Sequence, residues 1–142
     1  GIGLSPDGRL LYFNDSFGLR TLVYDLDPDD PMPRNRRLFA EHEDGVPDGM
    51  TVDADGGVWI AFWNGGRVAR YAPDGTLGRT IALPCPNVTA VCFTGAALDM
   101  LVITTAREGM SDAELAAHPE AGHVFVCWPG ETGLAEPLFD LR

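Results

Sequence analysis

The sequence has little that would suit a membrane or nucleic-acid protein. No apolar run approaches the roughly 18 residues that a membrane-spanning helix needs, and no signal peptide is visible. Positive charge is scarce, because 10 Lys and Arg residues stand against 21 Asp and Glu, for a net charge of −11. Phosphate contacts need clustered basic side chains. We therefore expect neither a nucleic acid nor a membrane as partner.

Potential metal-binding side chains other than carboxylates are also few. The cysteines are Cys85, Cys92 and Cys127, and the histidines are His42, His118 and His123. The cysteines are odd in number and lack CxxC spacing, and Cys92 and Cys127 lie in apolar, strand-like runs. This pattern favours free, buried thiols in a reducing compartment, so we expect a cytoplasmic protein. The histidine spacing indicates no zinc site, and we expect these side chains to be structural or solvent-facing.

What the chain does contain suits one soluble domain. It has 142 residues, of which 45% are hydrophobic and 22% charged, enough for a sizeable core. The acidic excess is consistent with cation binding or with an ordinary solvated surface, and charge alone favours the surface. The chain begins with Gly-Ile-Gly and not with methionine, so we expect it to be part of a longer protein.

A repeat organises the sequence. Residues 4–13 read LSPDGRLLYF and residues 51–60 read TVDADGGVWI. Aligning Asp7 with Asp55 gives a separation of 48 residues (55 − 7 = 48) and matches the apolar positions that follow. A third, weaker copy begins near residue 88. A period of about 40 to 50 residues indicates a repeat architecture.

Each copy predicts four short strands, because β-branched and aromatic runs alternate with turn residues. The predicted strands are 1–5, 9–15, 20–26 and 35–40, then 49–53, 57–63, 67–72 and 78–83, then 88–93, 99–105, 123–128 and 136–140. Such units are typical of β-propeller blades, here at about 1–43, 44–85 and 86–142. The exception is 111–119, where the Ser-x-x-Glu pattern predicts the capping box of a short helix.

Three blades do not close a ring, since propellers have about four to eight. Either the chain is half of a propeller of about six blades, or two copies associate. The first explanation is the simpler. Three open blades would expose two sheet faces and favour aggregation.

Three Asp-Gly pairs lie close together at Asp44–Gly45, Asp48–Gly49 and Asp55–Gly56. Asp55–Gly56 matches a turn in the first copy and predicts a hairpin, and Asp44–Gly45 predicts a polar loop. Asp48 differs, because it follows a proline that fixes the chain at the start of a blade's innermost strand. It is either a turn aspartate that binds backbone amides or a metal ligand or general base at the channel mouth.

Other polar residues are expected at the same mouth, because the loop between a blade's second and third strands returns to the start of its first strand. Asp15 and Ser16 either support the site from behind or cap a turn. Asn64 and Arg107 either contact substrate or serve in a turn and a salt bridge. The repeat places the counterpart of Asp48 immediately before Gly1 in the first copy. In the third copy it falls near Val88, which cannot bind a metal.

Several stretches, in this order, resemble the C-terminal half of the SMP-30/gluconolactonase family: LSPDGRLLYFNDS, VPDGMTVDADGGVWIA, NGGRVARYAPDG and PEAGHVF. The resemblance implies an all-β fold, a six-bladed propeller. It also implies one divalent cation in the channel, Ca²⁺ or Zn²⁺, with Mg²⁺ and Mn²⁺ also compatible. The implied protein ligands are a Glu, an Asn and an Asp. The Asp corresponds to Asp48, the Asn to the position before Gly1, and the Glu to the N-terminal half.

The resemblance further implies a metal-dependent hydrolase that opens a sugar lactone to the aldonic acid. The cation would polarise the carbonyl, and Asp48 would serve as general base. The implied partners are the sugar lactone and the missing N-terminal half of the propeller. Two alternatives remain: a non-catalytic calcium-binding or regulatory propeller, and a hydrolase of other esters or phosphotriesters. A protein-interaction propeller is disfavoured, because the Gly-His and Trp-Asp signatures are absent.

Overall fold

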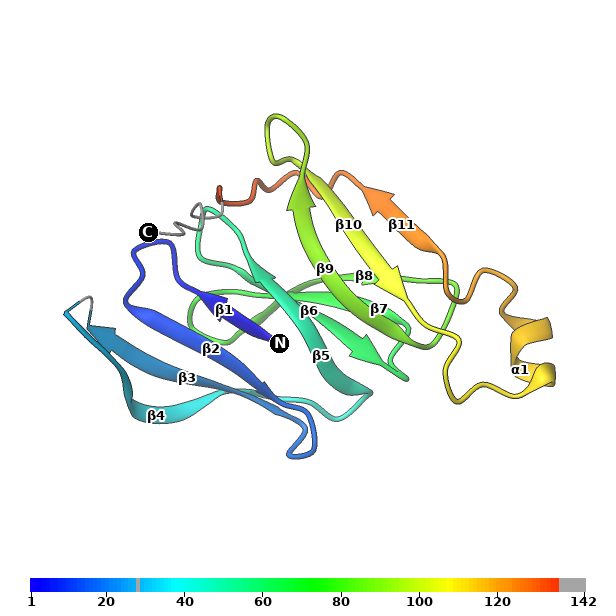
Figure 1. The fold of residues 1–142 in the computed structure, drawn as a ribbon, viewed down its shortest axis with the longest axis horizontal. Coiled ribbons are helices and arrows are strands. Elements are labelled where there is room, and N and C mark those ends of the chain that lie inside the picture. Colours follow the sequence, from blue (N-terminus) through cyan, green and yellow to red (C-terminus); the bar gives the residue numbers. More distant parts are fainter. Residues whose placement is uncertain (28, 136–142) are drawn as a thin grey trace, which may run out of the picture.

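The computed structural model of the protein describes residues 1–27 and 29–135, and the strand predicted at 136–140 lies outside them. The described residues form three antiparallel sheets and one short helix (Figure 1). In the described residues, no helix is both long and apolar enough to cross a membrane.

The first two sheets have four strands each, and their spatial order follows the sequence. The first contains β1 (Ile2–Leu4), β2 (Leu10–Asp15), β3 (Arg20–Asp27) and β4 (Asp30–Glu41). The second contains β5 (Val46–Val52), β6 (Val58–Trp63), β7 (Arg67–Tyr71) and β8 (Leu77–Ala82). These eight strands overlap the eight predicted ones.

The third sheet has the order β11-β10-β9. Its strands are β9 (Val88–Thr94), β10 (Met100–Thr105) and β11 (Val124–Cys127). The helix α1 (Asp112–Ala117) lies between β10 and β11, and the predicted capping box of Ser111 and Glu114 is present. The helix extends away from the sheets at one side of the molecule (Figure 1).

Strand β4 is longer than predicted, with 12 residues, and is almost entirely exposed. It is an edge strand that pairs with β3 through several register shifts. Proline is tolerated on such an edge, because its missing N–H costs no ladder bond there. Exposed ion pairs of Arg34 with Asp30 and of Arg37 with Asp25 accompany it. The predicted strand covered 35–40, so the polar, proline-containing residues 30–34 were not assigned to it.

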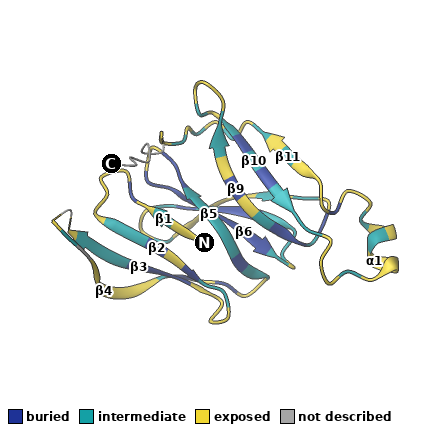
Figure 2. Ribbon diagram, in the orientation of Figure 1, coloured by how far each residue is buried: buried dark blue, intermediate teal, exposed yellow. Residues whose placement is uncertain are grey.

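The core lies between successive sheets, and β6 is its centre. Val58, Ile60 and Phe62 pack toward the first sheet, whereas Trp59 and Ala61 pack toward the third. Because successive strand residues face opposite sides, the apolar run VWIAF is buried on both faces, as Figure 2 shows for β6.

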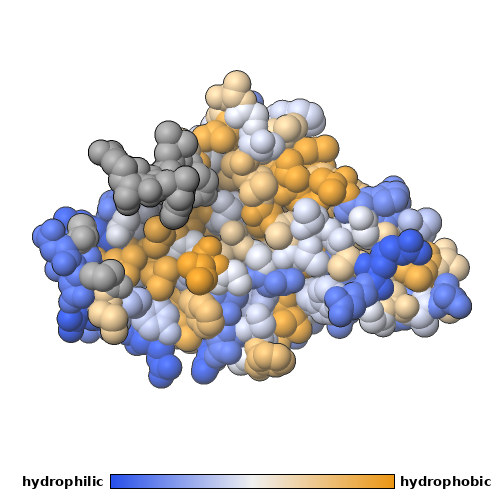
Figure 3. Space-filling view, in the orientation of Figure 1, coloured by the Kyte–Doolittle hydropathy of each residue, from blue (hydrophilic) through white to orange (hydrophobic). Residues whose placement is uncertain are grey.

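The inner strands β1, β5 and β9 are neighbours. The sheets therefore follow one another around a shared inner edge, which is consistent with part of a β-propeller. Among the exposed apolar side chains are Ile2 and Leu4 of β1, and Val124 and Val126 of β11. Figure 3 shows apolar surface in both regions.

The three cysteines are free, but they are not all buried as predicted. Cys85 is buried, Cys127 is half-buried and Cys92 is exposed. Cys92 follows Val91, which packs into the core, so its side chain faces the other side of β9. The apolar sequence around Cys92 therefore did not imply that both faces of β9 are buried.

Candidate functional site

The start of each inner strand lies beside the end of the second strand of its sheet. The pairs are Ile2 with Phe13, Val46 with Trp63 and Val88 with Thr105. In Figure 1 the β2–β3 turn, the start of β5 and the loop toward α1 lie along the lower edge. The shared end that the strand reversals predict is therefore present, and we call it the mouth.

Asp48 lies at the mouth, within β5 and not in a turn. Pro47 pairs with Phe62 and Met50 with Ile60, so Asp48 and Gly49 together oppose one residue of β6. This two-against-one arrangement is a β-bulge, a feature that redirects a side chain and is common beside active sites. Among the three Asp-Gly pairs, Asp55–Gly56 does form the predicted turn, between β5 and β6.

Two side chains of the first sheet hold the bulge. The Asn14 Nδ2 donates to the carbonyl oxygen of Asp48 at 2.7 Å. The Ser16 Oγ donates to the carbonyl oxygen of Pro47, also at 2.7 Å. The peptide groups before and after Asp48 are therefore both held by hydrogen bonds, one from Ser16 in the β2–β3 turn and one from Asn14 near the end of β2.

The Asp48 side chain is half-buried. Burial raises the pKa of its carboxyl above the ordinary value. Gly1 lies directly against the Asp48 carbonyl and the backbone of Gly49 and Met50. Gly1 is therefore a neighbour of Asp48.

The other predicted mouth residues have different surroundings. Asp15 pairs with Arg20 at 2.9 Å and accepts the Gly18 N–H, which are turn-stabilising contacts. Asn64 is exposed and has a φ of 56° in the β6–β7 turn. Arg107 is exposed and lies beside Gly122. Of the four predicted neighbours, the structure brings Ser16 to the Asp48 segment.

Sequence reasoning missed Asn14 and Asn87. Asn14 is buried at an inward position of β2, two residues after the buried Tyr12, so a polar residue in the apolar phase of a strand was the available signal. Asn87 is buried just before β9. Its Nδ2 donates to the Glu108 carbonyl, while its Oδ1 lacks a hydrogen-bond partner within residues 1–27 and 29–135.

The donor set fits a cation only in part. In the portion of the chain that the structure describes, no three His, Cys, Asp or Glu side chains converge to hold a metal ion. Asp48 supplies one hard oxygen donor, of the type that Ca²⁺ and Mg²⁺ prefer. A complete coordination shell would need ligands beyond these residues.

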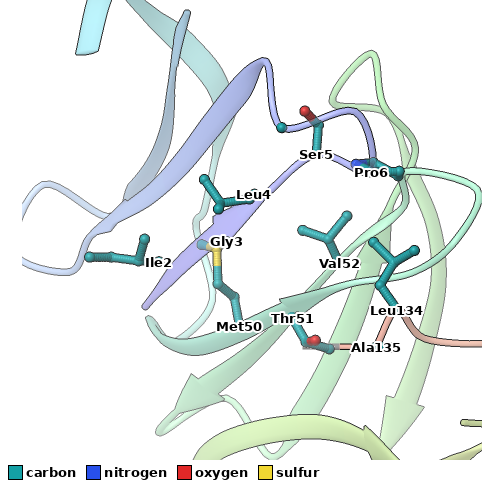
Figure 4. A pocket seen from close by; sticks show the side chains of 11 residues that line it. Ile2, Gly3, Leu4, Ser5, Pro6, Met50, Thr51, Val52, Leu134 and Ala135 are labelled. Carbon is teal, nitrogen blue, oxygen red and sulfur yellow. The ribbon is translucent and has the colours of Figure 1, made fainter. Parts of the chain in front are cut away.

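A separate hollow lies between β1 and β5, and Figure 4 shows Leu4, Val52 and Leu134 around it. No charged side chain among residues 1–27 and 29–135 lines it, and the Ser5 hydroxyl is occupied by Asp7 and the Leu10 N–H within its own turn. The hollow offers apolar contacts without an acid or base, so we place the candidate site at Asp48.

The sequence of the chain is similar to those of known proteins. Residues 1–107 match the family described as "SMP-30/Gluconolactonase/LRE-like region". The chain is 44% identical to an L-arabinolactonase of Azospirillum brasilense over 97% of its own length and 46% of the relative. It is 39% identical to a regucalcin of Danio rerio, over 88% of its own length and 43% of the relative.

The chain is also similar to a solved structure. The chain superposes on a calcium-binding protein, regucalcin, from Agrobacterium tumefaciens with a TM-score of 0.92 and 33% identity. The match covers 99% of this chain and 49% of that one. The chain thus spans about half the length of the relatives it matches.

Proposed function

Because this chain belongs to the SMP-30/Gluconolactonase/LRE-like family, we propose that the protein containing it is a metal-dependent hydrolase that opens sugar lactones to aldonic acids. The similarity to an L-arabinolactonase supports a lactone as substrate. The observation that carries the proposal is the Asp48 bulge, in which a half-buried carboxylate sits on a backbone fixed by Asn14 and Ser16.

Asp48 would be one ligand of a divalent cation, Ca²⁺ or Zn²⁺, with Mg²⁺ or Mn²⁺ as further candidates. A residue joined to the Gly1 nitrogen would also lie next to Asp48, because Gly1 already contacts it. That position is the counterpart of Asp48 in the repeat, and the family resemblance implies an Asn ligand there. The similarity to a calcium-binding regucalcin supports calcium among these ions.

The chemistry is a hydrolysis. When bound, the cation would polarise the lactone carbonyl and stabilise negative charge on its oxygen. Asp48 would accept a proton from the attacking water, whose oxygen bonds to the carbonyl carbon. The ring carbon–oxygen bond then breaks, and the ring oxygen leaves as a hydroxyl after taking up a proton. Each lactone opened releases one carboxylic acid.

We further propose that the three sheets are three blades of a six-bladed propeller, at about 1–43, 44–85 and 86–142. The rest of the propeller would supply the remaining ligands and most substrate contacts. Asn64 and Arg107, both exposed at the mouth, stay candidates for substrate contact, and Asp15 and Ser16 for support of the site.

The second candidate function is a non-catalytic calcium-binding propeller, which the similarity to regucalcins favours. The same site would also accept other esters or phosphotriesters, because a Lewis acid can polarise their C=O or P=O groups in the same way.

Acid release from an arabinonolactone and a gluconolactone tests the proposal on the complete protein. We expect activity to fall after EDTA treatment and to return with Ca²⁺, Zn²⁺, Mg²⁺ or Mn²⁺. Asp48→Asn should lower kcat/KM by about 10² to 10⁴-fold, the usual contribution of a general base. The matched control is Asp55→Asn, in an exposed turn at the other end of β5, which should leave activity unchanged.

The outcomes separate the candidates. A metal-loaded protein that opens no lactone contradicts the enzyme hypothesis. If calorimetry still detects Ca²⁺ binding that Asp48→Asn removes, the non-catalytic calcium-binding function replaces it. If Asp48→Asn and wild type are equally active, Asp48 is neither base nor ligand.

A further inference from the structure

A buried chain of hydrogen bonds runs from the outer part of the second sheet to the Asp48 bulge. The Tyr71 hydroxyl lies 3.1 Å from His42 Nδ1, and His42 Nε2 lies 2.9 Å from Thr21 Oγ1. Thr21 Oγ1 donates to Asn14 Oδ1 at 2.7 Å, and Asn14 Nδ2 donates to the Asp48 carbonyl. We call Tyr71, His42, Thr21 and Asn14 the relay.

The relay is shielded from solvent along its whole length. Its four side chains are 0 to 7% exposed: Thr21 0%, Asn14 4%, His42 5% and Tyr71 7%. His42 directly follows β4, and its ring meets the rings of Phe62 and Tyr71 edge-on. Buried polar groups that lack a partner are costly, so each member depends on the next.

The hydrogen bonds can point in one direction only. The single Thr21 hydrogen goes to Asn14 Oδ1, so Thr21 Oγ1 must accept from His42 Nε2. His42 stays neutral, because burial lowers its pKa to about 4 and the positive charge of Arg67 adds to that effect. A neutral imidazole carries one N–H, so Nδ1 is an acceptor and the Tyr71 hydroxyl donates to it.

This direction fixes the Asn14 amide. With Oδ1 accepting from Thr21, the Nδ2 group must face the Asp48 carbonyl. A flipped amide would set the Asn14 Oδ1 against the Asp48 carbonyl oxygen, and neither oxygen carries a hydrogen to donate. The donor that holds the bulge is therefore specified by residues on β3, after β4 and on β7.

We propose that Asn14 is a positioning residue for the candidate site: oriented by Thr21, His42 and Tyr71, it fixes the Asp48 peptide and thereby the direction of the Asp48 carboxylate. The expected effect of Asn14 on metal binding and catalysis rests on the proposed function. Its effect on the Asp48 peptide does not depend on that function. Outer-sphere partners of this kind commonly change metal affinity or activity by about 10- to 100-fold.

The test uses three variants and a matched control in the complete protein. Thr21→Val keeps the side-chain shape but removes the hydroxyl that orients Asn14. Thr21→Ser restores the hydroxyl, and Asn14→Asp removes the Nδ2 donor. The control is Thr104→Val, which removes a strand hydroxyl that bonds Thr89 and lies outside the relay.

Three readouts are compared: amide hydrogen exchange over residues 45–52, Ca²⁺ affinity by calorimetry, and kcat and KM for lactone opening. In Thr21→Val we expect exchange over 45–52 to accelerate by about tenfold and Ca²⁺ binding to weaken by about 10- to 100-fold. The lactone kcat should fall with little change in KM. Thr21→Ser should behave as wild type, and Asn14→Asp should reproduce or exceed the Thr21→Val effects.

The proposal is overturned if Thr21→Val leaves exchange over 45–52 unchanged, if Thr21→Ser fails to rescue, or if Thr104→Val causes the same changes. Should Asn14→Asp unfold, the Thr21 pair decides. If wild type neither opens lactones nor binds Ca²⁺, the proposed function fails, and exchange over 45–52 decides the positioning role by itself.

Discussion

Gly49 of the inner strand β5 faces the inner strand β9, and its missing side chain lets the two strands approach. A side-chain carbon at this position would be 2.7 Å from both the Ala90 Cα and the Thr89 carbonyl oxygen. Both are backbone atoms that cannot rotate away. In the Pro-Asp-Gly run, the proline therefore restricts the backbone, the aspartate supplies a carboxylate and the glycine leaves room for the neighbouring strand.

We predict that Gly49→Ala destabilises the complete protein by about 1 to 3 kcal/mol, the usual cost of forcing an extra group into a packed contact. Urea-induced unfolding measures the change. The matched control is Gly78→Ala on β8, where the added carbon would meet its nearest neighbour, the Arg70 carbonyl oxygen, at 3.5 Å. Equal losses in the two variants would show that the β5–β9 approach is not responsible.

At the scale of residues, the sequence predicted Ser16 near Asp48 but missed Asn14. Asp48 stood out because the repeat assigned Asp55–Gly56 to a hairpin turn and the polar surroundings assigned Asp44–Gly45 to a loop. Asn14 lies 34 residues from Asp48 in sequence, and its contact depends on how the first two sheets pack. His42 lies in a locally polar run, EHEDG, and is buried by Phe62 and Tyr71 from the second sheet. No local pattern carries such information.

At the scale of elements, strands with clear alternation and the capped helix were predicted well. Strand β4 was underestimated because edge strands tolerate proline and charge. The segment that connects β4 to β5 carries His42, which joins the two sheets through hydrogen bonds to Thr21 and Tyr71. This junction should respond to acid.

The sign of that response follows from the pKa of His42, which burial lowers from 6.5 to about 4. Between these pH values the unfolded chain binds a proton that the folded protein excludes. The stabilisation is therefore complete above about pH 6.5 and is lost as the pH falls toward 4. The shift corresponds to about 3 kcal/mol of unfolding free energy.

We predict that His42→Gln flattens the dependence of unfolding free energy on pH between 4 and 6.5. Urea titrations at several pH values measure it. His123→Gln, at an exposed histidine, is the control and should keep the wild-type slope. A slope that His42→Gln leaves unchanged would assign acid sensitivity to other groups.

At the scale of the whole molecule, the two ends of the sheet array are apolar. On β1, Ile2 is 64% exposed, and near the other end Val124 is 63% and Trp128 69% exposed. Contiguous apolar surface of this kind usually marks an interface. Since the chain spans about half of its relatives, the rest of a propeller is the expected cover.

We predict that residues 1–142 expressed alone self-associate, whereas the complete protein does not expose these faces. Sedimentation velocity over a range of concentrations distinguishes the two. Replacing Val124 and Val126 by Thr should reduce the association, because it keeps strand propensity while lowering apolar area. A monodisperse monomer of the segment at high concentration would contradict the prediction.

The one-way relay also has a consequence for the history of this family. A change at one of its four positions leaves a buried donor or acceptor on the next, so single replacements should be rarely tolerated. Natural relatives should therefore either keep Asn14, Thr21, His42 and Tyr71 together or replace several of them with apolar residues at once. Joint inheritance of these positions, visible in an alignment of relatives, would be the evolutionary trace of a bond direction.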